Sequence, residues 1–167
     1  MNSKLLIAVG AGLIMLGSVA AASAKPNQAF LTDTIQGNLA EISMGQLAQK
    51  NGGSDGVRSF GQMLVQDPSA ANEKATSLAQ TQGLTPPTAP KPEAKKEYDR
   101  LSKLNGEAFD EKFAKHMVAD HKKDIKEFEK QAKGSDDVAS FAKHTLPTLK
   151  KHLQTAQSLE SGKSAQK

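Results

Sequence analysis

Apolar residues recur every three to four positions along most of the chain, and the period-two alternation typical of strands is almost absent. This pattern predicts four long helices and one short helix, so the expected fold class is all-α. The long helices are expected over about residues 28–50, 54–81, 107–133 and 135–161, and the short one over about 93–104. Asn51-Gly52-Gly53, Gly83 and Gly134 supply the stop signals.

The two halves of the chain resemble each other. The segment Ser54–Gly61 matches Ser135–Ala142, and the two serines give an offset of 135 − 54 = 81 positions. Between the halves lies a proline-rich connection over residues 83–92. Two αα-hairpins joined by a long crossover and a short extra helix predict a four-helix bundle of the ferritin-like kind, with polar sites in its core.

Prolines fall inside the second and fourth predicted long helices. Asp67-Pro68 resembles a helix restart, with Asp67 as the cap and Pro68 in the first turn. Pro147 removes a backbone hydrogen bond, so it is expected to kink or break the last helix.

The N-terminal segment has the pattern of an export signal. Lys4 provides a positive start, Leu5–Ala24 carries no charge, and Ala22-Ser23-Ala24 fits a cleavage site. We therefore expect a cleaved signal peptide over residues 1–24, a bundle over 25–161, a flexible tail over 162–167 and a periplasmic location. The alternative is an uncleaved anchor over residues 5–24 in the inner membrane.

Composition narrows the classes of partner. The net charge is only +4, acidic and basic residues are interspersed, and one Tyr and no Trp are present, which argues against nucleic-acid binding. The sequence holds no glycine-rich phosphate loop and no serine nucleophile motif, so it identifies no small-molecule substrate. With these classes set aside, an envelope protein is the partner that we expect. The sequence does not indicate the oligomeric state. Without cysteine there is neither a disulfide nor a thiolate metal ligand.

All four histidines lie between positions 116 and 152. His121 is four residues from both Met117 and Ile125, and His152 is three residues from Leu149, so both rings fall on apolar faces. A buried imidazole needs a carboxylate, a carbonyl or a metal ion as partner. His116 and His144 are expected to be peripheral.

Three carboxylates share or adjoin these faces. Asp67 lies on the apolar face of the second helix, Glu41 adjoins that of the first, and Asp120 precedes His121. Imidazole with carboxylate suits iron, zinc, manganese or copper. The candidate metal ligands are therefore His121, His152, Glu41, Asp67 and Asp120. In the alternative interpretation the histidines are core residues hydrogen-bonded to Asp67, Glu41 or each other. In that case Asp67 is a helix cap and Asp120 an exposed acid.

A set of short motifs resembles a known family. The resemblance rests on Ala40-Glu41-Ile42, Met63–Asp67, Gly106–Asp110, Met117–His121 and Thr145–Leu153. In these motifs the chain is similar to the DUF4142 family of exported bacterial proteins, often labelled outer membrane proteins. The resemblance spans about residues 28–160 and implies a ferritin-like helical bundle and export, while the family's biochemical role is largely undefined.

The chain also departs from the pattern of that family. An Asp-His pair is usual on the second helix as well as the third, whereas here the first pair is Asp67-Pro68. The Glu-x-x-His spacing of di-iron bundles is absent as well, because Asp120 and His121 are adjacent. We therefore expect a non-enzymatic bundle that binds one metal ion and acts in envelope or stress functions. The alternatives are a ferroxidase-type redox enzyme and a purely structural or partner-binding module.

Overall fold

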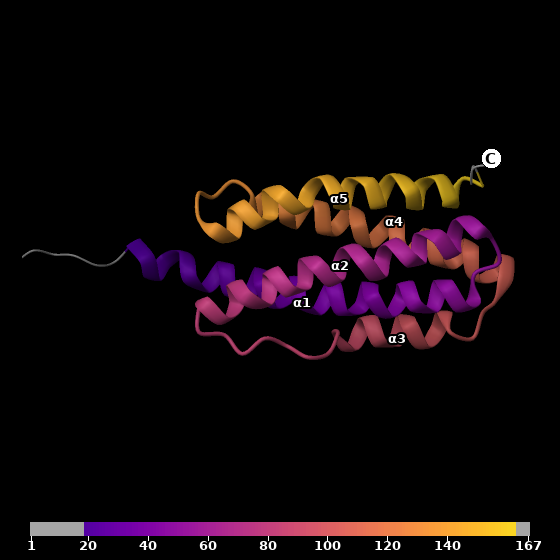
Figure 1. Ribbon diagram of the computed structural model, residues 1–167, viewed down its shortest axis with the longest axis horizontal. Coiled ribbons are helices and arrows are strands. Elements are labelled where there is room, and N and C mark those ends of the chain that lie inside the picture. The colour runs from indigo at the N-terminus through magenta and orange to yellow at the C-terminus, as the bar shows by residue number, and fades with distance from the viewer. Residues whose placement is uncertain (1–18, 163–167) are drawn as a thin grey trace, which may run out of the picture.

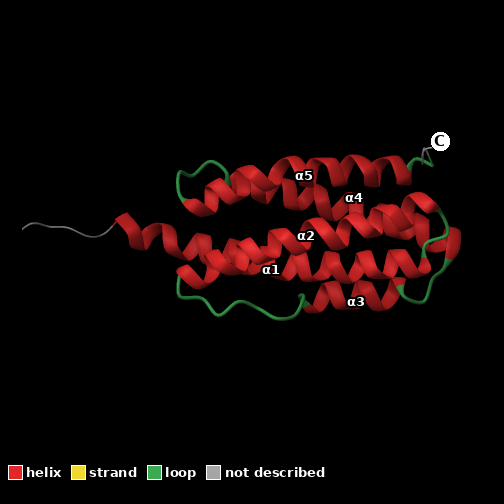
Figure 2. Ribbon diagram, viewed as in Figure 1, coloured by secondary structure: helices red, strands yellow, loops and turns green. Residues whose placement is uncertain are grey.

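A computed structural model describes the backbone of residues 19–162 and the side chains from residue 26 onward. Figures 1 and 2 show an elongated bundle whose described part is helical except for its connections. The helices are α1 (Val19–Asn51), α2 (Asp55–Thr81), α3 (Pro92–Leu101), α4 (Gly106–Gln131) and α5 (Asp137–Glu160). The all-α prediction is confirmed, and the long elements fall close to the predicted ranges except at the start of α1, which lies about nine residues earlier.

The long helices form two hairpins. α1 packs along α2, and α4 packs along α5, while α2 faces α5 and α1 faces α4 more sparsely. The short α3 lies along the outside of α1, near α4, after the proline-rich crossover (Figure 1). This is the predicted arrangement of two αα-hairpins in a four-helix bundle.

Helices α2 and α5 begin at the capping residues that the sequence predicts. Ser54 Oγ accepts a hydrogen bond from the Val57 amide at 3.2 Å, and Asp136 Oδ1 accepts one from the Ala139 amide at 2.8 Å. Each oxygen satisfies an amide that has no partner inside its own helix. The equivalent caps at the starts of α2 and α5 reflect the internal similarity of the two halves.

The expected proline breaks are wrong. α2 continues through Pro68 and α5 continues through Pro147. Each proline removes one hydrogen bond, but packing against the other helices holds the rest of the ladder together. Asp67 is therefore not the cap of a restarted helix, and its carboxylate is free to contact another side chain.

The ends of the chain are described only in part. α1 begins at Val19, earlier than predicted and inside the expected signal peptide, in a stretch where alanine favours helix. The rest of the predicted leader, residues 1–18, and residues 163–167 of the predicted tail lie outside the described residues. Among the described helices, none has the length and apolar character needed to cross a membrane.

The core is divided by a polar layer. One apolar cluster contains Phe60, Phe109 and Phe113, and the other contains Leu31, Ile35 and Phe128 near the opposite ends of the same helices. Between them, each of three helices contributes a buried polar side chain. These residues are Glu41 on α1, His121 on α4 and His152 on α5.

A close contact between α1 and α2 fixes the position of Glu41. A Cβ atom built on Gly45 would lie 2.6 Å from the carbonyl oxygen of Gly61, and one built on Gly61 would lie 2.6 Å from that of Gly45. Only glycine allows the two backbones to approach so closely. The small residue at position 45 therefore admits a neighbouring helix, one turn from Glu41.

We predict that Gly45→Ala lowers the free energy of unfolding by about 1–3 kcal/mol, because the two helices have to separate. The measurement is urea unfolding followed by circular dichroism. Gly37→Ala is the matched control, since a Cβ at Gly37 meets nothing within 4 Å. Alanine there is expected to stabilise α1 by up to about 1 kcal/mol. Equal stability changes in the two variants would contradict the packing argument.

Candidate metal centre

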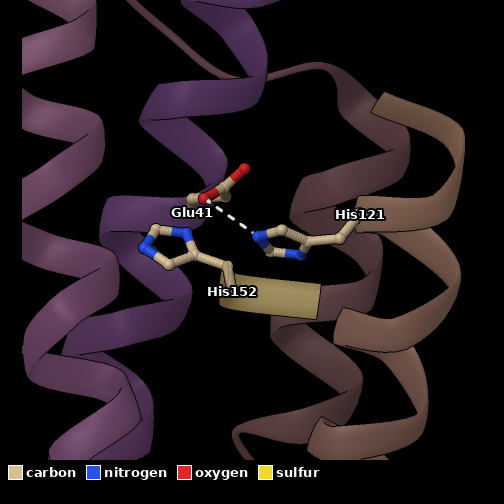
Figure 3. Close-up of side chains that lie close together, drawn as sticks. All are labelled: Glu41, His121 and His152. Atoms are coloured by element: carbon tan, nitrogen blue, oxygen red, sulfur yellow. Dashed lines mark ion pairs between the residues drawn. The ribbon is translucent and has the colours of Figure 1, made fainter. Parts of the chain in front are cut away.

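The polar layer brings together side chains from α1, α4 and α5. Figure 3 shows Glu41, His121 and His152 directed toward one another. Each residue offers one ligand atom, and the three atoms lie within 4.8 Å of one another. His121 and His152 are 0% and 1% exposed and Glu41 is 4% exposed, so water cannot satisfy them freely.

Hydrogen bonds use one nitrogen of each imidazole and leave the other free. His121 Nδ1 donates to the Met117 carbonyl oxygen at 3.0 Å, and His152 Nε2 donates to Asp67 Oδ2 at 2.9 Å. Both acceptors are oxygens without a hydrogen, so the hydrogen belongs to the nitrogen. A neutral ring then carries its lone pair on the other nitrogen, which is Nε2 of His121 and Nδ1 of His152.

The atoms with lone pairs are also the atoms without partners. Glu41 Oε2, His121 Nε2 and His152 Nδ1 are buried and make no hydrogen bond. In Figure 3 these two nitrogens are directed toward the carboxylate of Glu41, and the nearer gap, from His121 Nε2 to Glu41 Oε2, is 3.8 Å. When Glu41 is ionised, its oxygen and the two imidazole nitrogens bring three unpaired lone pairs together, and these repel each other and destabilise the fold unless a cation joins them.

Packing holds the rings in place. The two imidazoles meet edge to face with their centroids 5.4 Å apart, and Phe60 packs edge to face on His152 at 5.9 Å. Phe60 is fully buried in one of the apolar clusters. The ring orientations are therefore set before any ligand arrives, which lowers the entropic cost of binding.

The electrostatics of the layer favour neutral side chains. Burial, followed by the charges of Asp124 and Asp120, raises the pKa of Glu41 well above its ordinary value. Burial and the neighbouring His152 lower the pKa of His121 to about 4. At 3.8 Å Glu41 and His121 are close enough for an ion pair. The cost of burying both charges nevertheless outweighs their attraction at this distance.

A second group of acids adjoins Glu41. Asp120 and Asp124 are one turn apart on α4, and an oxygen from each lies within 4.8 Å of one from Glu41. All three line a groove of about 480 Å³ between α1, α3 and α4. Burial and the charge of Asp120 raise the pKa of Asp124 to about 7.

We predict that Asp124→Asn becomes more stable than the parent protein as pH rises. Because its pKa is raised on folding, Asp124 contributes stability below about pH 4 and loses it as pH rises through about 7. We expect the variant to gain about 1–3 kcal/mol at pH 8, after allowing for solvent screening. Urea unfolding at pH 4 to 8, with a chelator present, tests this prediction.

Glu127→Gln is the charge-matched control, since Glu127 is exposed and lies one turn beyond Asp124 in the same groove. The difference in free energy of unfolding between Glu127→Gln and the parent protein is expected to stay constant from pH 4 to 8. A parallel rise in both variants would show that net charge, rather than the buried position of Asp124, determines the effect.

The structure separates the five residues expected to act as ligands. Glu41, His121 and His152 come together, whereas Asp67 contacts the far nitrogen of His152, and Asp120 belongs to the neighbouring acidic group. Asp67 is 39% exposed and holds its histidine from outside the cluster. Asp124 was not among the expected ligands, although its four-residue spacing from Asp120 places both on one helix face.

The other histidines lie away from this centre, as the sequence predicted. His116 is half-buried and has Nδ1 3.8 Å from Glu97 Oε1 on α3. His144 is exposed on α5 and contacts the Ser140 carbonyl oxygen of its own helix at 2.7 Å. Neither ring belongs to the cluster formed by Glu41, His121 and His152.

Comparison with known proteins supports the family resemblance and the helical fold. A family model described as "Domain of unknown function (DUF4142)" matches residues 16–159. A solved structure of a DUF305 fragment from Deinococcus radiodurans is similar, with a TM-score of 0.73 and 14% sequence identity over 83% of this chain and 97% of that one. At this identity the likeness concerns the fold alone. No curated protein matches the chain.

Proposed function

The chain belongs to the DUF4142 family, described as a domain of unknown function, and we propose its role from the geometry of the polar layer. We propose that the protein is an exported helical bundle that binds one transition-metal ion through Glu41, His121 and His152. The observation that carries the proposal is the convergence of three buried ligand atoms that have no hydrogen-bond partner.

The donor set defines the class of metal. Two imidazole nitrogens and one carboxylate oxygen suit iron, zinc, manganese or copper, and they are poor ligands for magnesium or calcium. Asp67 supports this assignment, because metal-binding histidines commonly donate a hydrogen bond from their second nitrogen to a carboxylate. The Met117 carbonyl oxygen plays the same part for His121.

The envelope is the compartment that we propose for this activity. The uncharged stretch Leu5–Ala24 and its small residues at 22 and 24 have the pattern of an export signal. A bundle without cysteine keeps its ligands unchanged in an oxidising compartment, because imidazole and carboxylate do not form disulfides. We propose a role in metal handling or stress protection there, with binding rather than catalysis as the activity.

The test is metal stoichiometry of the purified full chain. The protein is stripped with chelator and incubated with Zn²⁺, Cu²⁺, Mn²⁺ or, without oxygen, Fe²⁺. After desalting, its metal content is measured by mass spectrometry. We expect tight retention of at least one transition metal, lost in His121→Ala and in His152→Ala. His144→Ala is the matched control, because this exposed histidine lies outside the centre.

Two results would overturn the proposal. One is that none of the four metals is retained by the parent protein. The other is that retention falls equally in His144→Ala and His121→Ala, which would indicate unspecific binding to surface histidines. Circular dichroism of each variant separates lost binding from lost folding.

We predict that Asp67→Ala weakens metal binding by about 10- to 100-fold without abolishing it, since outer carboxylates orient the ligand rather than bind the ion. Competition with a chromogenic chelator measures the affinity. Asp67→Asn is expected to be milder, because an amide oxygen still accepts the hydrogen of His152 Nε2. Unchanged affinity in Asp67→Ala would remove the positioning role of this residue.

A further inference from the structure

Glu41 belongs to two groups of ligand atoms. One group joins it with His121 and His152, and the other joins it with Asp120 and Asp124. Asp120 and His121 are adjacent on α4, and neighbouring helix positions point about 100° apart. Their side chains therefore extend in different directions from α4. The two groups therefore meet at Glu41 and extend in different directions from it.

The acidic group differs from acids on an ordinary surface. Glu41 is 4% exposed, and its Oε2 is buried without a hydrogen-bond partner. Asp120 and Asp124 are half-buried in the same groove. Three carboxyl groups within 4.8 Å of one another repel when ionised, and a cation between them reverses that repulsion.

We infer that Glu41, Asp120 and Asp124 form a second cation site beside the histidine site, with Glu41 shared by the two ions. The inference rests on the proposed function for the first ion and extends it to a pair. Its ligands are carboxylate oxygens alone, so the second site takes a hard divalent cation such as Mn²⁺, Mg²⁺ or Ca²⁺.

The groove gives this second site access to solvent. It is lined by further acids, which attract cations: Glu127 is exposed there, while Glu97 is already paired with Arg100. Lys91 also lines the groove, but its ammonium is paired with Asp33 at 2.7 Å. Lys123 also lines the groove and is exposed, and its charge, like that of Lys91, favours the ionised form of Asp124.

Two paramagnetic probes test the pair of sites. The full chain receives one equivalent of Cu²⁺, which prefers imidazole, and is then titrated with Mn²⁺ while both ions are followed by electron paramagnetic resonance. We expect one further Mn²⁺ per chain. We also expect the Cu²⁺ signal to lose intensity as Mn²⁺ binds, because two paramagnetic ions on one carboxylate couple.

Variants locate the second ion. Asp124→Asn is expected to weaken the binding of Mn²⁺ beside Cu²⁺ by at least about tenfold while leaving the nitrogen hyperfine pattern of Cu²⁺ unchanged. Asp120→Asn is expected to act in the same way. Glu127→Gln removes the same charge from the same groove and is expected to change the Mn²⁺ affinity by less than about threefold. The inference would be overturned if Glu127→Gln weakened Mn²⁺ binding as much as Asp124→Asn does. It would also be overturned if no Mn²⁺ bound beside the Cu²⁺ ion.

Failure of the first site gives a different result. If Cu²⁺ shows no nitrogen ligands, the proposed function fails, whatever Mn²⁺ does. Mn²⁺ is then titrated alone into the parent protein, His152→Ala and Asp124→Asn. Loss of Mn²⁺ only in Asp124→Asn supports the carboxylate site by itself, and equal binding in all three proteins overturns it.

Discussion

Metal ion at about 1,000 times its Kd is expected to raise the free energy of unfolding of the stripped protein by about 4 kcal/mol. The ion joins Glu41, His121 and His152, which converts three unsatisfied buried atoms into ligands. The thermal midpoint should rise on the order of 10 °C. Differential scanning calorimetry with and without one of the transition metals measures both quantities.

The variants define the origin of this stabilisation. Glu41→Gln, which keeps the shape of the side chain but not its charge, is expected to lose most of the shift. His144→Ala is expected to keep it, because His144 is exposed away from the centre. A full shift in Glu41→Gln would exclude Glu41 as a ligand. Binding of metal to histidines of the unfolded chain reduces the stabilisation, and slightly less in His144→Ala, which has one histidine fewer than Glu41→Gln.

Glu41→Met is expected to stabilise the metal-free protein by about 1–3 kcal/mol at pH 8, because an apolar side chain replaces an acid that is costly to bury. The gain should be smaller at pH 5. Burial raises the pKa of Glu41, so its own contribution to stability is present at low pH and is lost as pH rises through that value. Urea unfolding in the presence of chelator measures the difference at both pH values.

The same substitution should have the opposite sign once metal is added. The parent protein gains the binding free energy and Glu41→Met does not, so the order of stability reverses at saturating metal. Such a reversal is the expected sign of a side chain kept for binding at the expense of stability. If Glu41→Met is less stable than the parent with chelator as well as with metal, Glu41 serves packing instead.

Much of the fold follows from local signals in the sequence. Ser54 and the Ser135-Asp136-Asp137 run predict where two helices begin, because side-chain oxygens satisfy the free amides of a first helical turn. The match to the family model confirms the resemblance to DUF4142. The similarity of the two halves predicts the hairpin pairing, since equivalent helices bury equivalent faces.

The helix breaks expected at the prolines do not occur, for a physical reason. The sequence shows the loss of a hydrogen bond at Pro68 and Pro147, but not that both helices continue past it. Pro68 is buried within the bundle, so its ring contributes apolar contact at the position where a hydrogen bond is lost. Local propensity is a weak guide where tertiary contacts oppose it.

The candidate site is predictable in kind but not in detail. Periodicity places His121 and His152 on inward faces, and both are buried. It does not reveal that Asp67 contacts the outer nitrogen of His152, or that Asp124 joins Asp120 near Glu41, because such relations depend on the rotation of one helix against another. Spacing along one helix identifies candidate ligands, and the packing of the helices determines which of them come together.

The polar layer also bears on how the bundle opens. Glu41 belongs to one hairpin and the two histidines to the other, so the unsatisfied atoms lie on the seam between them. Parting that seam lets water reach all three groups, whereas parting α1 from α2 exposes their packed apolar faces without that gain. In the metal-free protein, partial unfolding should therefore begin with separation of the two hairpins. A bound ion would link the hairpins and oppose that separation.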